Sequence, residues 1–89
     1  MKPGDLITPD PECGFLNGEV YLYPEKSLRD HTLLIPFRVG EIGTVLEVSF
    51  TYQEYGDGSR DIKEWIPVCR ILTSEGTGWI MRNYLARIP

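Results

Sequence analysis

The sequence predicts an all-β protein, folded as one small barrel of five to six strands around a single core. Seven prolines and nine glycines break the chain into short pieces rich in β-branched and aromatic residues, which is typical of many short strands. Polar and apolar side chains alternate most clearly from residue 42 to residue 52. A chain of this length buries only about two-thirds of its unfolded surface, so we expect one domain spanning residues 1–89.

The N-terminal residues 1–18 are predicted to form the first strand and an extension. The strand corresponds to the sequence "GDLIT". Pro9, Pro11 and Gly14 follow, and proline cannot donate a hydrogen bond to a strand ladder. Two alternatives therefore stay open for the extension, an ordered loop and an irregular arm that solubilises the domain or meets a basic partner.

A second strand is predicted in "GEVYLY", with Val20 and Leu22 on one side and Tyr21 and Tyr23 on the other. The residues from 24 to 38 contain proline and mixed charges, which favours a long first loop. The side chains that we expect this segment to turn inward are Leu33, Leu34 and Phe37.

The longest alternating run lies in "EIGTVLEVSFTYQEY". Its apolar residues share even numbers, and period-two alternation buries one face of a strand. We therefore expect the even-numbered side chains to point into the barrel. They are Ile42, Leu46, Val48, Phe50 and Tyr52.

A hairpin is predicted to follow, because Asp57-Gly58 can adopt the positive φ of a tight turn. The returning strand is "DIKEWIPVCRIL", in which Pro67 lacks an N–H and so marks a sheet edge or a bulge. A strand at "GWIMR", a tight turn at "NYL" and a last strand at "ARI" complete the chain. Closure into a barrel limits the number of exposed edges.

The C-terminal part resembles the Src-homology-3 (SH3) fold. Members of that family have a glutamate-tryptophan step at a strand end, a glycine followed by an aromatic-aliphatic pair, and Asn-Tyr-aliphatic in a short 3₁₀ turn before the last strand. "VYLY" and "FRVGEIGTVLEV" are similar to the strands that enter and leave the family's long first loop. The matching residues are Glu64-Trp65, Gly78-Trp79-Ile80, Asn83-Tyr84-Leu85 and residues 86–88.

Two differences separate this chain from peptide-binding SH3 domains. Met81 stands where those members have a proline, and Glu25 stands where they have a second tyrosine after the position of Tyr23. Both family residues help to form a polyproline groove. The sequence also resembles bacterial SH3 modules that bind walls or partners, and free-standing SH3-like barrels of bacteriophages and marine bacteria, which implies that association with a virion is an alternative to a cytoplasmic location.

The candidate binding residues are Tyr21, Tyr23, Trp65 and Tyr84. Rigid amphipathic rings bind extended peptides or sugars at a low cost in conformational entropy, so these four side chains are a candidate aromatic surface for a protein or peptide partner. The alternative is that the rings only cover the ends of a core too small to be closed by aliphatic residues.

Catalysis and metal binding have little support in the sequence. His31 beside Asp30 could act as a base for Cys13 or Cys69, but no spacing brings these groups together. Zinc sites have paired ligands a few residues apart, and this chain has none. We therefore expect a protein that is not an enzyme, with no cofactor and no metal. Cys13 and Cys69 could form one disulfide, but without a spacing motif we favour two free thiols.

The net charge of −4 disfavours nucleic acid as a partner. A barrel that binds nucleic acid through the basic residues Lys63, Arg70, Arg82 and Arg87 is nevertheless an alternative, and a cell-wall or glycan binder that uses the aromatic residues is another. No apolar run is long enough for a membrane helix and no signal segment is evident, so we expect no membrane partner. The strand that contains Pro67 offers an edge for pairing with a second copy of the chain.

Overall fold

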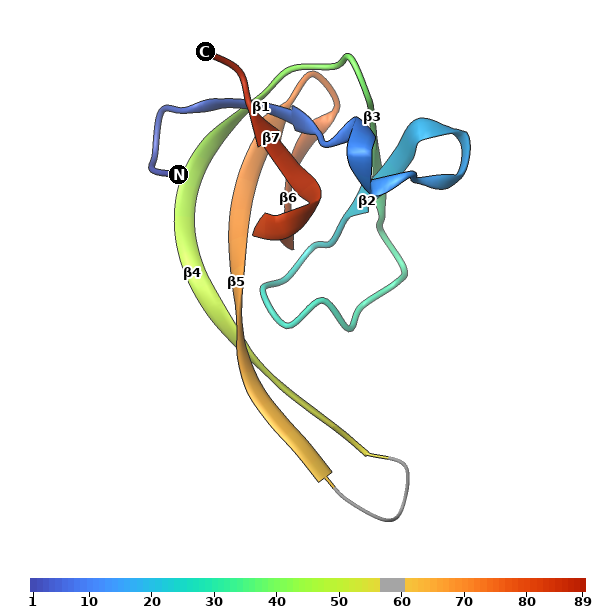
Figure 1. The fold of residues 1–89 in the computed structure, drawn as a ribbon, viewed down its shortest axis with the longest axis vertical. Coiled ribbons are helices and arrows are strands. Elements are labelled where there is room, and N and C mark those ends of the chain that lie inside the picture. The colour runs from blue at the N-terminus through green and yellow to red at the C-terminus, as the bar shows by residue number, and fades with distance from the viewer. Residues whose placement is uncertain (57–60) are drawn as a thin grey trace.

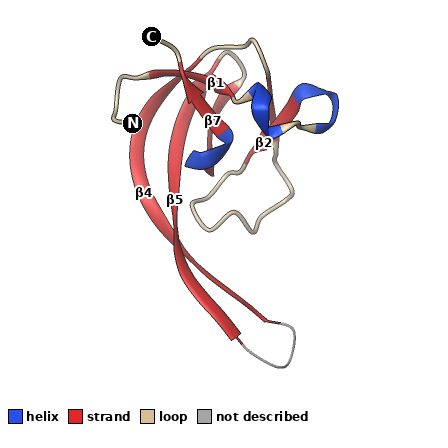
Figure 2. Ribbon diagram, viewed as in Figure 1, coloured by secondary structure: helices blue, strands red, loops and turns tan. Residues whose placement is uncertain are grey.

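The computed structural model describes residues 1–56 and 61–89 and confirms the all-β class (Figures 1 and 2). The strands are β1 (Leu6–Pro9), β2 (Glu19–Leu22), β3 (Ile35–Arg38), β4 (Gly43–Gly56), β5 (Asp61–Thr73), β6 (Gly76–Met81) and β7 (Leu85–Arg87). Three short 3₁₀ turns accompany them: η1 (Pro11–Cys13), η2 (Leu16–Gly18) and η3 (Arg82–Tyr84).

The strands form two antiparallel sheets, and neither sheet closes on itself. The larger sheet has the order β6-β5-β4-β1-β7, and the smaller one consists of β2 and β3. Two backbone hydrogen bonds join them: the N–H of Tyr23 donates to the Trp79 carbonyl at 2.8 Å, and the N–H of Trp79 donates back at 2.7 Å. The sheets therefore enclose one interior from two sides.

The core lies between these sheets and is aliphatic apart from one aromatic ring, that of Phe37. The alternation predicted for "GEVYLY" is confirmed, because Val20 and Leu22 are buried while Tyr21 is exposed. The buried apolar cluster consists of Ile7, Val20, Leu22, Phe37, Val45, Cys69, Ile71, Ile80 and Leu85.

Gly78 is the point of closest approach between the two sheets. A Cβ atom added there would lie 2.5 Å from the Cβ of Leu22 and 3.1 Å from the Tyr23 carbonyl oxygen. Only a residue without a side chain fits at that distance. Gly78 therefore allows β2 to reach β6 and form the bridge between Tyr23 and Trp79.

The prediction that even-numbered residues of β4 fill the interior is wrong. The buried residues of β4 include Val45 and Thr51, whereas Ile42, just before the strand, and Val48, Phe50 and Tyr52 are exposed and Leu46 is only half-buried. A bulge at Leu46 shifts the register, since Val45 pairs with Ile71 but Glu47 pairs with Arg70. Beyond the bulge, Thr51 on the odd-numbered side is buried and the even-numbered side is exposed.

The prediction of a long hairpin, formed by β4 and β5, is confirmed. Figure 1 shows β4 and β5 continuing past the other strands as a two-stranded ribbon. Pro67 lies just beyond the last pair that β5 makes with β6, Val68 with Met81, so the predicted edge position is confirmed. The turn predicted at Asp57-Gly58 lies outside the described residues.

The segment between β2 and β3 is a long loop, as predicted, and we call residues 23–34 the 23–34 loop. Its apolar side chains behave differently from the expectation: Leu33 is exposed and Leu34 is half-buried, while Phe37 is fully buried but belongs to β3. The N-terminal extension is an ordered segment with two 3₁₀ turns, the first capped by the Asp10 carboxylate.

Candidate functional site

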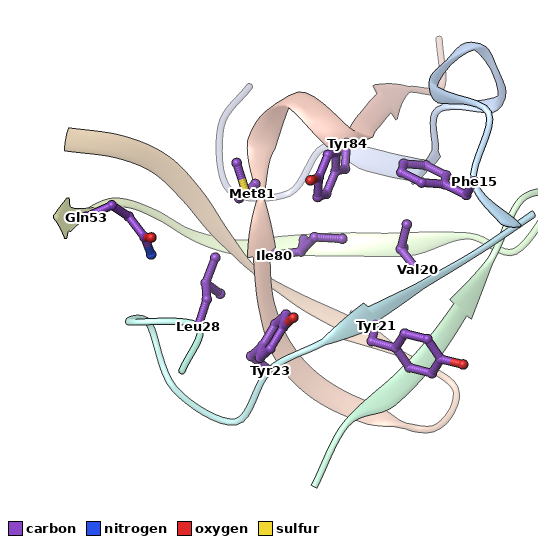
Figure 3. A pocket seen from close by; sticks show the side chains of 9 residues that line it. All are labelled: Phe15, Val20, Tyr21, Tyr23, Leu28, Gln53, Ile80, Met81 and Tyr84. Carbon is purple, nitrogen blue, oxygen red and sulfur yellow. The ribbon is translucent and has the colours of Figure 1, made fainter. Parts of the chain in front are cut away.

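A pocket of about 330 Å³ opens between β2, β6 and the 23–34 loop (Figure 3). None of its lining side chains is charged. In Figure 3, Val20 and Ile80 lie between Tyr84 and Phe15 on one side and Tyr21 and Tyr23 on the other. The full lining is Phe15, Val20, Tyr21, Tyr23, Leu28, Gln53, Ile80, Met81 and Tyr84.

Six different parts of the chain bring these side chains together. Tyr84 belongs to η3, and its ring meets the ring of Phe15 edge to face with centroids 5.3 Å apart. The same T-shaped arrangement, at 5.4 Å, holds Tyr23 against His31 of the 23–34 loop. Such pairs are favourable beyond the area that they bury, so the aromatic walls are held in defined orientations before any ligand binds.

Tyr21 is oriented by a chain of polar contacts along the sheet of β2 and β3. Its hydroxyl donates a hydrogen bond of 2.5 Å to Glu19, and the other carboxylate oxygen of Glu19 lies 2.8 Å from Nε of Arg38. The hydrogen bond to the Glu19 carboxylate raises the pKa of Tyr21, with the negative charge of Glu19 acting in the same direction. The phenol is therefore un-ionised at neutral pH and acts as a donor.

The far wall of the pocket comes from the 23–34 loop, which is fixed by one carboxylate. The oxygens of Glu25 accept hydrogen bonds from the backbone N–H groups of Asp30 and Arg29, each at 2.8 Å, and from that of Ser27 at 2.9 Å. Leu28, at the centre of these contacts, has a φ of 59°, which costs energy for a residue with a Cβ. The loop thus holds Leu28 at the pocket in a strained conformation.

This arrangement predicts a pH-dependent loop. The N–H of Asp30, followed by those of Arg29 and Ser27, lowers the pKa of Glu25 from its ordinary value of 4.5 against the opposing effect of desolvation. A lowered pKa means that the contribution to loop stability is complete above about pH 4.5 and is lost as the pH falls through the lowered value. We expect the amide NMR signals of Arg29 and Asp30 to shift with a midpoint below 4.5.

The Glu25→Gln variant is the control for that titration, because it keeps the shape of the side chain without the ionisable group. Its Arg29 and Asp30 signals should lack the transition. The pKa of the Asp30 carboxylate is also lowered, chiefly by the hydrogen bond from the Thr32 hydroxyl. The Asp30→Asn variant removes this second titration, so that the titration of Glu25 can be followed alone. A transition that persists in Glu25→Gln and vanishes in Asp30→Asn would contradict the assignment.

The structure brings three of the four predicted site residues together, namely Tyr21, Tyr23 and Tyr84. Trp65 lies elsewhere, on the projecting part of the hairpin, where it pairs across the strands with Tyr52 at a centroid distance of 5.3 Å. A single surface of all four rings is therefore not present. Sequence spacing gave no information on this point, because Trp65 follows the hairpin away from the core.

The pocket also contains residues that the sequence analysis did not single out, Phe15, Leu28 and Gln53, together with Met81, which it noted only as a replacement for a proline. Phe15 was a detectable candidate, since an aromatic residue in an otherwise polar extension needs a covering partner. Gln53 is one of the odd-numbered, polar residues of β4, and its amide nitrogen donates to the Ser27 carbonyl at 3.3 Å. Only the packing of the 23–34 loop reveals its role.

The four basic residues considered for nucleic-acid binding do not form a free cationic stripe. Nζ of Lys63 lies 3.5 Å from Glu54, and Nε of Arg70 lies 3.4 Å from Glu47, an ion pair without hydrogen-bond geometry. Arg82 and Arg87 belong to different elements, η3 and β7. Two of the four charges are thus already balanced by carboxylates.

The candidate catalytic and metal-binding groups have separate surroundings. The thiol of Cys13 is exposed and 3.6 Å from the Asn83 carbonyl, while Cys69 is buried with its sulfur 3.7 Å from that of Met1. Both cysteines are free thiols, as expected. Across residues 1–56 and 61–89 no three His, Cys, Asp or Glu side chains are grouped as a metal site.

Within the described part of the chain, no helix has the length and apolar character that crossing a membrane requires. Comparisons of the chain with protein-family models, with curated proteins and with solved structures found no match.

Proposed function

We propose that this chain is a non-catalytic protein-interaction module of the SH3-like type, and that it binds an extended peptide segment in the aromatic pocket. The observation that carries the proposal is the uncharged lining of a pocket of about 330 Å³, in which rings from β2 and η3 surround the aliphatic floor of Val20 and Ile80. Ligand sites are typically apolar clefts of this size with a few polar groups that fix orientation.

The SH3-like assignment is supported by the order of the elements. A long loop separates β2 from β3, the strands β4, β5 and β6 form a meander, and η3 directly precedes β7. The first and last strands, β1 and β7, pair with each other. These features match the order of motifs through which the sequence resembles that family.

The chemistry of the pocket favours a bulky apolar side chain on the ligand over a polyproline helix. Met81 contributes a flexible thioether where peptide-binding SH3 domains have a proline, and thioethers adapt to side chains of varied shape. Glu25, which stands in place of the second tyrosine, is turned into its own loop. The hydroxyl groups of Tyr23 and Tyr84 can contact the backbone of an extended peptide, whereas the Tyr21 hydroxyl and the Gln53 amide nitrogen already donate to Glu19 and Ser27.

The test is a selection of short random peptides, displayed on phage, against the folded chain. The strongest peptide is synthesised and its Kd is measured for the wild type and for Tyr84→Ala, which removes one wall of the pocket. We expect Tyr84→Ala to weaken binding by about tenfold or more, the loss typical of a buried aromatic contact at an interface.

Tyr52→Ala is the matched control for this measurement. Tyr52 is 40% exposed and Tyr84 is 37% exposed, and each ring contacts one other aromatic ring at 5.3 Å. Only Tyr84 lines the pocket. Failure to select any peptide, or equal losses in the two variants, would contradict the proposed site.

Salt dependence separates this function from nucleic-acid binding. A ligand held by uncharged side chains should bind almost equally well at low and high ionic strength. Binding through phosphates would fall by about 1,000-fold or more for six to ten neutralised phosphates between 50 mM and 200 mM salt. Measurement of the Kd of the selected peptide over this range of salt concentrations therefore tests both interpretations.

A further inference from the structure

We infer that the projecting hairpin carries a second interaction surface, and that its occupant is a second copy of this chain. The inference does not depend on the proposed function of the pocket. It concerns the even-numbered side of β4 and the residues that pair with it on β5. We call this surface the hairpin face, and it consists of Val48, Phe50, Tyr52, Trp65 and Pro67. Cys69, the partner of Val48, is buried beside Met1 and is not part of it.

Strand pairing makes the hairpin face continuous. Phe50 is directly opposite Pro67, and Tyr52 is directly opposite Trp65. Residues opposite each other in antiparallel strands project to the same side at about 5 Å, and next-but-one residues of a strand share that side. The rings of Tyr52 and Trp65 accordingly lie in contact at 5.3 Å.

The opposite side of the same hairpin is already covered. Thr51 is buried there, Gln53 donates to the Ser27 carbonyl, and Nζ of Lys26 lies 3.4 Å from the Ser49 hydroxyl. The 23–34 loop thus packs on the odd-numbered side and leaves the hairpin face open. Occupation of the hairpin face would leave the pocket accessible.

The three rings of the hairpin face form a contiguous exposed apolar patch. Phe50 is 57% exposed, Tyr52 40% and Trp65 66%. At about 200 Å² per ring the three leave about 300 Å² of surface in water, a size comparable to the largest apolar patch of a typical soluble monomer, which is often functional. Burial of such a surface is favourable in proportion to its area.

The area also fits a pair of identical copies. A two-fold symmetric contact uses the same surface twice, so the rings of both copies together would bury about 600 Å² of apolar surface. Val48, Pro67 and the polar rim add to this, which brings the contact towards the roughly 1,200 Å² at which specific interfaces begin. The hairpin projects from the rest of the chain (Figure 1), so its outer part can be approached from outside the body.

The charge distribution favours a second copy as the occupant. The chain has a net charge of −4, which opposes contacts between copies wherever acidic side chains meet. The hairpin face, however, carries only uncharged side chains from Val48 to Tyr52 and from Trp65 to Pro67, and the next pair towards the tip, Glu54 with Lys63, is a neutral ion pair at 3.5 Å. Two such faces meet without opposing like charges.

The experiment is sedimentation equilibrium of the full chain over a range of concentrations up to about 1 mM, a limit at which even weak specific pairs are populated. We expect a reversible dimer for the wild type. Trp65→Lys and Phe50→Lys should each weaken dimerisation by about 30-fold or more, because each removes a central ring and places charge in the contact. Ile42→Lys, at an exposed apolar residue of similar exposure, 58%, outside the hairpin face, should leave it unchanged.

Unfolding in urea verifies that the lysine variants keep the fold, which is expected because both side chains lie in water in the single chain. A wild type that stays monomeric up to about 1 mM would overturn the inference and leave the hairpin face to a different protein. A dimer that is equally stable in Trp65→Lys, Phe50→Lys and the wild type would place the contact elsewhere, and would overturn it as well.

Discussion

Phe37→Ala is expected to lower the free energy of unfolding by about 3 to 5 kcal/mol, the largest effect of any single truncation in this chain. The ring is fully buried in β3 between the two sheets. Its surroundings are tight: a Cβ atom added at Gly43 would lie 3.1 Å from the Cζ of Phe37. Removal of the ring leaves a cavity that neighbouring backbone cannot fill.

A domain of this size is stabilised by only about 5 to 15 kcal/mol in total, so the variant should unfold at much lower urea concentration than the wild type. Phe37→Leu keeps most of the apolar volume and should lose less. Ile42→Ala removes an exposed aliphatic side chain and should change the free energy of unfolding by no more than about 0.5 kcal/mol. Equal losses in Phe37→Ala and Ile42→Ala would show that the ring is not the centre of the core.

Gly78→Ala is expected to cost about 1 to 3 kcal/mol, the usual penalty for overpacking. The added methyl group would meet the Cβ of Leu22 at 2.5 Å and the backbone carbonyl of Tyr23 at 3.1 Å. The backbone must therefore move, because a carbonyl cannot rotate aside as a flexible side chain can. The hydrogen bonds between Tyr23 and Trp79 should open with it.

Hydrogen exchange of the Tyr23 and Trp79 amides, followed by NMR, measures this local opening, and urea unfolding measures the global cost. Thr77→Ala is the control in the same strand, where the side chain is exposed and only strand propensity changes, by about 1 kcal/mol or less. Protection of the two amides at the wild-type level in Gly78→Ala would show that the sheets can separate without breaking the bridge. Loss of the bridge would displace Tyr23 from the pocket.

The parts of the fold that the sequence predicted best are those governed by local patterns. In β2 each apolar residue alternates with a polar or aromatic one over four positions, and the strand is too short for the phase to change. In β4 the same pattern failed. Period-two alternation defines two faces of a strand, but it does not say which face another segment covers.

Two long-range facts decide that question in β4. The bulge at Leu46 shifts the pairing of β4 with β5, and the 23–34 loop covers the odd-numbered side through Ser49 and Gln53. Neither is visible in the alternation itself. The exposed Phe50 looked like a core residue by type, and only its position on the projecting hairpin shows otherwise.

The candidate site shows the same division. The spacing of Tyr21 and Tyr23 in one strand correctly indicated that they share a side, and the Asn-Tyr-Leu step indicated the 3₁₀ turn that presents Tyr84. Trp65 could not be separated from them without the course of the hairpin. Phe15 and Leu28 belong to irregular segments, whose packing depends on contacts such as those of Glu25 that have no sequence period.

The alternating sides of β4 have a consequence for how this protein can vary. Odd-numbered positions such as Thr51 and Gln53 face the 23–34 loop, and even-numbered ones such as Phe50 and Tyr52 face outward. Substitutions on one side of the strand can therefore accumulate with little effect on the other side. One pair of strands thus offers two separate surfaces, and the proposed peptide binding and the proposed self-association could change independently among descendants of this sequence.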